Sequence, residues 1–187
     1  MGCNQSDTSY TGGRSLRLIM AGLDGSGKTT ILYQLLHRNF FTTTQTLGFN
    51  VETIQHRGDE LTVWDMGGHK SIRGLWKHYL FQAQGIIFVV DSSSRERLPE
   101  ARDVLQTLLR HRELDHVPVV ILANKRDKPD VLTERALLDG LGLYDVTGRL
   151  CTIQCTCAVT GDGLMKAIDN IVNFSKRAQE NSASKSA

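Results

Sequence analysis

Residues 22–29, with the sequence GLDGSGKT, constrain this chain more than any other stretch. They fit G-x-x-x-x-G-K-[ST], the pattern of a loop that wraps the phosphates of a nucleoside triphosphate. Residues 16–21 form a short apolar run typical of a strand, and residues 29–36 carry apolar side chains at helical spacing. A chance glycine-rich turn explains neither flank. The stretch therefore predicts a strand, a phosphate-binding loop and a helix in succession.

The residue types in this loop each have a chemical role. Glycines allow backbone N–H groups to approach phosphate oxygens closely, and the start of a helix adds a partial positive charge. Lys28 is expected to reach the β- and γ-phosphates, and the Thr29 hydroxyl to ligate Mg²⁺. The predicted nucleotide contacts from this region are Gly22, Leu23, Asp24, Gly25, Ser26, Gly27, Lys28, Thr29 and Thr30.

The length and composition predict one ordinary globular domain. The chain has 187 residues, of which 40% are hydrophobic and 22% charged, which is enough for a sizeable single core. Its net charge of +2 and the lack of like-charge blocks argue against a nucleic-acid partner. No apolar run approaches the length that spans a bilayer.

Three of the four cysteines, Cys151, Cys155 and Cys157, fall in one predicted strand and share a face of it. A metal site is one interpretation, but no histidine lies near them in the sequence and the spacing is not that of a zinc ligand set. Small buried thiols under a helix are favoured. Free thiols fit a reducing, cytosolic compartment.

The N-terminus carries a lipidation pattern. Residues 1–6, MGCNQS, match M-G-x-x-x-[ST], with Gly2 as the myristoyl acceptor and Cys3 beside it as a palmitoylation candidate. One myristoyl chain binds a membrane with only about 10⁴ M⁻¹, whereas two chains anchor stably. The alternative is a polar terminus with an accidental glycine. Residues 1–15 are predicted to be a flexible lipid tether, and residues 178–187 a disordered tail.

A threonine-rich loop and a hairpin follow the first helix. One threonine of residues 38–48 is expected to complete the Mg²⁺ shell, although this loop alone does not indicate which. Residues 49–56 and 61–65 read as antiparallel strands joined by a tight turn. Asp65-Met66-Gly67-Gly68 comes directly after the second strand. Asp65 is expected to hold Mg²⁺ through a water, and the Gly68 N–H to meet the γ-phosphate, with Gly67 beside it.

The base-binding residues are predicted at the ends of two later strands. Asn124-Lys125-Arg126-Asp127 follows the apolar strand at 118–123 and matches N-K-x-D. The Asp127 carboxylate is suited to accept from N1–H and the amino group of guanine, and adenine offers no such donor pair. The Lys125 stem is expected to cover the base. A backbone N–H near Cys157 and Ala158, after the strand at 150–157, is expected to meet guanine O6.

The order of these elements predicts an α/β fold of the P-loop NTPase type. We expect a three-layer sandwich with a mostly parallel six-stranded sheet, one antiparallel edge hairpin and helices on both faces, within residues 16–177. The helices are expected near residues 29–36, 72–79, 98–111, 133–141 and 163–176.

The four motifs in this order resemble the small GTPases, and further stretches resemble the Arf and Arf-like family. These are Gly22-Leu23-Asp24 and the segments TLGFNVE at 46–52, WDMGG at 64–68 and IRGLWKHY at 72–79. The likeness runs from about Arg17 to Phe174. It implies a GTP/GDP switch with Mg²⁺, with Thr46 as the threonine ligand. It also implies myristoylation at Gly2 and a monomer.

The resemblance extends to the expected partners. It implies an exchange factor, a GTPase-activating protein and effectors, with the chain on the cytosolic face of a membrane. It implies that Phe49, Trp64 and Tyr79 face effectors in the GTP state. Core packing is the alternative for these three rings, and both interpretations hold if the exposure of the rings differs between states.

Three departures from the family pattern bear on function. Gln45 stands where proline is usual, and residues 2–15 lack an apolar helical face, so a lipid tether would have to hold the membrane. His69 replaces the glutamine that orients the attacking water. We expect His69 to support only slow hydrolysis without an activating protein. The alternatives are a GTP-holding scaffold with negligible hydrolysis and an adenylate-type kinase or ATPase, and the N-K-x-D motif argues against the latter.

Overall fold

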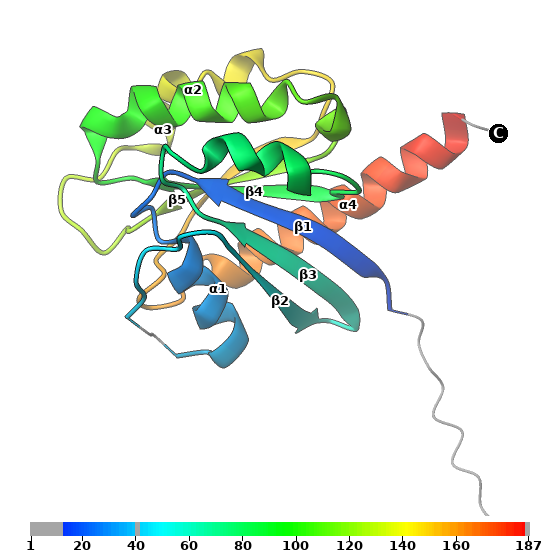
Figure 1. The fold of residues 1–187 in the computed structure, drawn as a ribbon, viewed down its shortest axis with the longest axis horizontal. Coiled ribbons are helices and arrows are strands. Elements are labelled where there is room, and N and C mark those ends of the chain that lie inside the picture. The colour runs from blue at the N-terminus through cyan, green and yellow to red at the C-terminus, as the bar shows by residue number, and fades with distance from the viewer. Residues whose placement is uncertain (1–12, 40–41, 186–187) are drawn as a thin grey trace, which may run out of the picture.

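Six strands form a single sheet in the order β2-β3-β1-β4-β5-β6 (Figure 1). The computed structural model describes residues 13–39 and 42–185. Every neighbouring pair is parallel except β2 and β3, which are antiparallel. The fold class predicted from the sequence is confirmed. The strands are β1 (Ser15–Gly22), β2 (Phe49–His56), β3 (Asp59–Met66), β4 (Gly85–Asp91), β5 (Val119–Asn124) and β6 (Cys151–Cys155).

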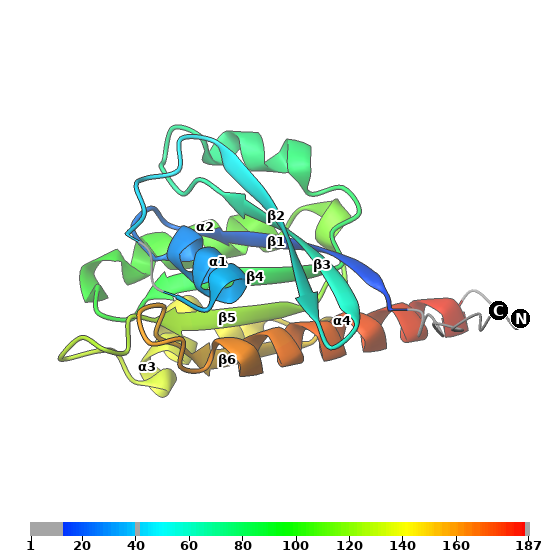
Figure 2. The same cartoon turned by 90° about the horizontal axis from the view of Figure 1, so that it is seen from below.

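Helices cover both faces of the sheet, as Figures 1 and 2 show. One hydrophobic cluster joins the sheet to α2 and α3, and a second joins it to α1 and α4. Side chains of β1 alternate between the clusters, because Ile19 belongs to the first and Leu18 and Met20 to the second. The helices are α1 (Lys28–His37), α2 (Leu98–Leu109), α3 (Glu134–Leu141) and α4 (Leu164–Lys185).

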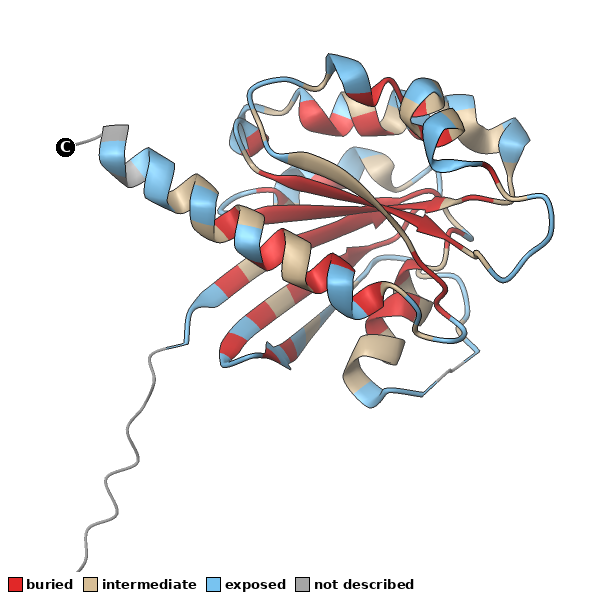
Figure 3. Cartoon of the chain, turned by 180° about the vertical axis from the view of Figure 1, so that it is seen from behind, coloured by how far each residue is buried: buried red, intermediate tan, exposed pale blue. Residues whose placement is uncertain are grey.

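The central strands are buried from both sides. All of β5 and nearly all of β4 are inaccessible to solvent, which explains their continuous apolar sequences (Figure 3). Because parallel strands of this sheet end at one edge, the loops after β1, β3, β4 and β5 gather there. Among the described residues, no helix is both long and apolar enough to cross a bilayer.

The structure differs from the sequence-based prediction in two segments. The stretch predicted as a helix at 72–79 is the 3₁₀-helix η1 (Arg73–Tyr79), in which Gly74 weakens the α-helical alternative. The tail predicted as disordered from residue 178 is helical as far as Lys185. Short 3₁₀ turns also occur at η2 (Arg95–Arg97), η3 (Arg112–Leu114) and η4 (Leu143–Asp145).

Local contacts accompany the C-terminal extension of α4. Ser182 and Ser184 each donate a hydroxyl hydrogen bond to a carbonyl four residues earlier, which satisfies them within the helix. Glu180 lies 3.8 Å from Arg14. The predicted domain limit at residue 177 therefore falls inside a helix. The lipidation candidates Gly2 and Cys3 lie outside the described residues.

Candidate nucleotide-binding site

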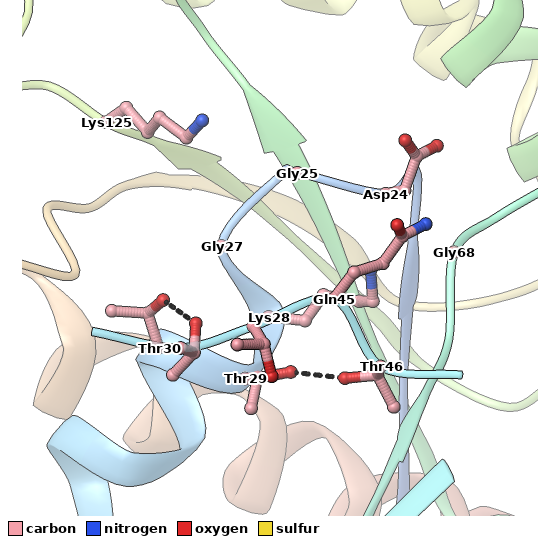
Figure 4. Close-up of a pocket in the computed structure, with 12 residues that line it drawn as sticks. Asp24, Gly25, Gly27, Lys28, Thr29, Thr30, Gln45, Thr46, Gly68 and Lys125 are labelled. Atoms are coloured by element: carbon pink, nitrogen blue, oxygen red, sulfur yellow. Dashed lines mark hydrogen bonds between the residues drawn. The ribbon is translucent and has the colours of Figure 1, made fainter. Parts of the chain in front are cut away.

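The phosphate loop turns at the end of β1 and leads into α1, as predicted (Figure 4). Gly27 has a φ of 97°, and a Cβ there would lie 2.4 Å from the Asn124 amide nitrogen, so only glycine fits. Gly27 also caps α1 without any side-chain hydrogen bond to the first helical N–H groups. Those donors are therefore available to an anion.

The loop borders a pocket of about 410 Å³. Its remaining wall comes from the threonine-rich segment, from the loop after β3 and from Lys125 (Figure 4). The pocket is lined by Asp24, Gly25, Gly27, Lys28, Thr29, Thr30, Thr43, Thr44, Gln45, Thr46, Gly68 and Lys125. The structure thus brings together residues predicted to contact the phosphates, Mg²⁺ and the base, and they come from four separate parts of the chain.

Lys28 is a buried cation at the floor of this pocket. Its Nζ donates to the carbonyl oxygens of Gly22 at 3.1 Å and Leu23 at 2.9 Å. Burial lowers the pKa of Lys28 to about 8, against the opposing effect of the carboxylates of Asp65 and Asp24. An ammonium held in this way is prepared to meet a phosphate charge.

The predicted magnesium ligands converge on one point. The Thr29 hydroxyl donates to Asp65 Oδ2 at 2.6 Å. It also lies 2.9 Å from the Thr46 hydroxyl (Figure 4). Thr43 instead lies 3.0 Å from Thr30. The structure therefore places Thr46, the threonine that the family resemblance implied, beside Thr29.

This oxygen set fits a hard divalent cation. Two hydroxyls and a carboxylate are the ligand types that Mg²⁺ takes. The second oxygen of Asp65, Oδ1, is buried and has no hydrogen-bond partner among the described residues. Burial raises the pKa of Asp65, while the Thr29 hydroxyl and the Lys28 charge oppose that effect. A cation here would favour the ionised carboxylate.

The base end of the site is built by Asn124, Lys125 and Asp127. The Asn124 side chain does not face the pocket but donates to Ser26 O at 2.9 Å, so it braces the phosphate loop. Lys125 has a φ of 65° and pairs with Asp91 at 2.6 Å. Asp127 is exposed and accepts a 3.2 Å hydrogen bond from the Cys157 thiol.

The backbone donors predicted for guanine O6 already have partners. The N–H of Cys157 donates to Asp162 O at 3.0 Å, and that of Ala158 donates to Asn124 Oδ1 at 3.0 Å. A bond from either group to O6 therefore requires a shared or shifted hydrogen bond. Cys151 and Cys155 lie half-buried in β6, and Cys157 is buried beyond its end.

His69 does not point into the pocket. Its Nδ1 lies 2.8 Å from the Ser71 hydroxyl on the exposed surface, and His69 is not among the residues that line the pocket. The Ser71 N–H also approaches Nδ1, at 3.4 Å. The structure therefore leaves the predicted catalytic side chain apart from the phosphate residues.

The three aromatic rings predicted to face effectors form one cluster. Phe49 lies 5.3 Å from Trp64 and 4.7 Å from Tyr79, measured between ring centroids. The guanidinium of Arg17 stacks on the Trp64 ring, 3.9 Å from its centroid. Phe49 is 43% exposed, whereas Trp64 and Tyr79 are half-buried. The cluster is thus part packing and part surface.

A group of ion pairs beside the pocket was missed by sequence reasoning. Arg97 pairs with Asp24 of the phosphate loop at 2.9 Å, and Arg73 pairs with Glu100 of α2 at 2.8 Å. The i,i+3 spacing of Arg97 and Glu100 was a usable sign of one pair. Nothing in the sequence indicated the pairs that cross between elements.

The strand order, the phosphate loop and the convergent threonine and aspartate oxygens, together with the N-K-x-D residues after β5, define a P-loop GTPase. The family model of the ADP-ribosylation factor family matches residues 5–175, and the chain belongs to that family. Among solved structures, it is similar to the Arl6 (BBS3) small GTPase of Trypanosoma brucei with the bound nucleotide analogue GppNp. That match has a TM-score of 0.81 and 33% identity, and covers 88% of this chain and 99% of the other.

Membership of this family confirms the general prediction. The chain is a GTP-binding switch that binds GTP and GDP with Mg²⁺, hydrolyses GTP, and works with regulators and effectors. When bound, the ion supplies positive charge at the phosphates. In this chain Thr29 and Thr46 would hold it, with Asp65 behind them, while Lys28 and the N–H groups of the loop would orient the phosphates.

Proposed function

We propose that this chain is a membrane-tethered switch that hydrolyses GTP slowly until an activating protein acts on it. The observation that carries the proposal is the identity and direction of His69. Glutamine accepts a hydrogen bond from the attacking water and donates to a γ-phosphate oxygen at once. Neutral imidazole accepts through one nitrogen, and protonated imidazole does not accept at all.

The bond between His69 and Ser71 adds a second reason for slow hydrolysis. The imidazole must leave Ser71 before it reaches a water beside the γ-phosphate. An activating protein that turns His69 inward and supplies an arginine would remove both obstacles. Such an arginine is worth roughly 10³–10⁵ in rate.

Single-turnover hydrolysis tests this proposal. We expect the His69→Gln variant to hydrolyse bound GTP roughly tenfold faster than the wild type, or more. His78→Gln is the matched control, because His78 is an exposed histidine outside the pocket. Equal rates for His69→Gln and the wild type would contradict the proposal.

The membrane tether rests on the N-terminal pattern. Gly2 and Cys3 precede β1 by about a dozen residues. A segment of that length is long enough for a lipid on Gly2 or Cys3 to enter a bilayer beside the domain. We place the protein on the cytosolic face of a membrane, as a monomer. Vesicle flotation of protein expressed with an N-myristoyltransferase tests this: the wild type should float and Gly2→Ala should not. Flotation of Gly2→Ala at the wild-type level would contradict a myristoyl tether.

The second candidate is a scaffold that holds GTP with negligible hydrolysis, and the same histidine favours it. The nucleotide that co-purifies distinguishes the two. A slow switch carries mainly GDP after prolonged incubation, whereas a scaffold keeps GTP.

Pull-downs with GDP and with a non-hydrolysable GTP analogue, for wild type and Phe49→Ala, test the aromatic cluster as the effector surface. Equal capture by both nucleotide forms would contradict that role.

A further inference from the structure

The loop after β3 is packed tightly on the phosphate loop at Gly68. A Cβ on Gly68 would lie 2.4 Å from the backbone of three residues, Gly22, Leu23 and Asp24. No side chain fits at this position without backbone movement. The two loops are therefore in direct backbone contact. The direction of the two peptide groups that flank Gly68 is then set by the side chains that donate to their carbonyl oxygens.

Trp76 holds the peptide group before Gly68. Its indole Nε1 donates to the Gly67 carbonyl oxygen at 2.9 Å, and Trp76 is only 5% exposed. This carbonyl and the Gly68 N–H belong to the same planar trans peptide, so they point in opposite directions. A bond that fixes the carbonyl therefore also fixes the direction of the N–H that is predicted to meet the γ-phosphate.

Arg73 holds the peptide group after Gly68. Its Nε donates to the Gly68 carbonyl oxygen at 2.7 Å. The same guanidinium lies 2.8 Å from Glu100 and 3.5 Å from Asp24, and its side chain is 13% exposed. Arg73 thus ties the loop after β3 to α2 and to the phosphate loop.

Arg97 completes a set of four charged side chains, Asp24, Arg73, Arg97 and Glu100. Arg97 pairs with Asp24 at 2.9 Å and with Glu100 at 3.1 Å. Burial alone would raise the pKa of Asp24, but the hydrogen bond and charge of Arg97 hold it below its usual value. The hydrogen bond from Arg73 likewise lowers the pKa of Glu100. Both carboxylates are therefore charged at neutral pH.

We propose that Trp76 and Arg73 are positioning residues for the terminal phosphate, because they hold the two peptide groups that flank Gly68. This inference rests on the proposed switch function. GDP lacks the terminal phosphate, so the direction of the Gly68 N–H contributes to GTP binding alone. Contacts that only stabilise the fold would affect both nucleotides equally. The ratio of the two affinities therefore separates positioning from structural support.

The experiment measures dissociation constants for GDP and for a non-hydrolysable GTP analogue, using fluorescent nucleotides. Trp76→Phe keeps the ring but removes the donor, and Arg73→Lys keeps the charge but removes the Nε–H. We expect each to weaken the GTP analogue about three- to tenfold while GDP changes less than about twofold, since one hydrogen bond contributes about 0.5–1.5 kcal/mol.

Arg149→Lys is the matched control. Arg149 also donates to backbone carbonyls, those of Leu109, Leu114 and Val117, but it lies outside the pocket. Its substitution should lower the Tm and leave the affinity ratio unchanged. If Trp76→Phe or Arg73→Lys fails to fold, Glu100→Gln weakens the anchor of Arg73 without touching Gly68. It should shift the ratio in the same direction by a smaller factor.

The outcomes distinguish a failure of the switch function from a failure of the positioning role of Trp76 and Arg73. If the wild type shows the same exposed surface and the same effector capture with GDP and with the GTP analogue, both the switch function and this inference are overturned. A wild type that distinguishes them, with variants that weaken both nucleotides equally or leave both unchanged, overturns the inference alone.

Discussion

The side-chain amide of Asn124 joins the two ends of the nucleotide pocket. Its Nδ2 donates to the carbonyl of Ser26 at 2.9 Å, and its Oδ1 accepts from the N–H of Ala158 at 3.0 Å. All three residues are buried. The phosphate loop and the loop after β6 are therefore held in a fixed relation by one side chain.

Replacing Asn124 with alanine should weaken GTP and GDP binding by similar factors, about 10- to 100-fold. It leaves a buried carbonyl and a buried N–H without their partner, and each such loss costs about 1–3 kcal/mol. Nucleotide titration and urea unfolding measure the two effects. Asn173→Ala, on the exposed side of α4, is the control. A variant that loses affinity for GTP only would contradict this bracing role.

Ser71→Ala should accelerate GTP hydrolysis a few-fold, because it removes the hydroxyl that lies 2.8 Å from His69 Nδ1. The effect must pass through His69. In the His69→Gln background the same substitution should therefore change the single-turnover rate by less than about twofold. An equal acceleration in both backgrounds would show that Ser71 acts by another route.

Lys28→Met should abolish nucleotide binding without destabilising the nucleotide-free protein at pH 7. Burial lowers the pKa of Lys28 from 10.5 to about 8, so the folded chain carries a desolvated charge that costs about 3 kcal/mol. Methionine removes that cost and also two hydrogen bonds to carbonyls, so the expected gain in unfolding free energy lies between zero and about 3 kcal/mol. Urea unfolding measures this change.

The lowered pKa of Lys28 makes its contribution to stability depend on pH. Between pH 8 and 10.5 the unfolded chain binds more protons at this lysine than the folded one, so its contribution raises stability as the pH rises. The difference in unfolding free energy between Lys28→Met and wild type should therefore shrink from pH 7 to pH 9.5. A constant difference would contradict the lowered pKa.

The parts of the fold that were predictable are those in which a local pattern has one structural solution. Glycines at 22 and 27 are required where the backbone approaches Val89 and Asn124 closely. The run at 86–90 is apolar throughout because both of its faces are covered. Such constraints are visible in a single stretch of sequence. They indicated the sheet, the phosphate loop and the strand ends that carry the base-binding residues.

The parts that escaped prediction depend on partners distant in sequence. The pair of Arg97 with Asp24 joins positions 73 residues apart, and surface charges of that kind carry no local pattern. The same holds for the contact of Arg14 with Glu180 beside the helical tail. The loop around Thr46 offered several threonines of equal chemistry, and only the three-dimensional path, or a family resemblance, distinguishes them. The sequence identified His69 as the residue in place of the usual glutamine, but not the contact with Ser71 that turns its side chain away from the pocket.

Lys176→Gln should make the protein more sensitive to acid. The hydrogen bond from Lys176, 2.6 Å long, lowers the pKa of Asp59, and the Arg14 N–H adds to that effect. A carboxylate with a lowered folded pKa contributes stability above its unfolded value of 3.8, and that contribution is lost as the pH falls through its folded value. At pH 7 we expect a loss of about 1 kcal/mol.

The acid midpoint of unfolding should move to higher pH in Lys176→Gln, as followed by circular dichroism. Lys166→Gln provides the comparison, because Lys166 is exposed on the same helix. If both variants show the same acid midpoint, the pair with Asp59 does not hold the turn between β2 and β3 against α4.

Asp127→Asn should weaken GTP and GDP binding by about 100-fold or more and improve the binding of xanthine nucleotides. The carboxylate presents two acceptors to N1–H and to the amino group of guanine, whereas the amide replaces one acceptor with a donor. That donor faces a guanine N–H but suits the carbonyl that xanthine carries in place of the amino group. The 3.2 Å bond from the Cys157 thiol to Oδ1 survives if the amide oxygen takes that place, so stability should change little.

Competition between GDP and XDP measures the preference of Asp127→Asn for the two bases. Asp130→Asn is the control, because Asp130 is an exposed carboxylate of the same loop. Unchanged GDP affinity in Asp127→Asn would mean that another group reads the base.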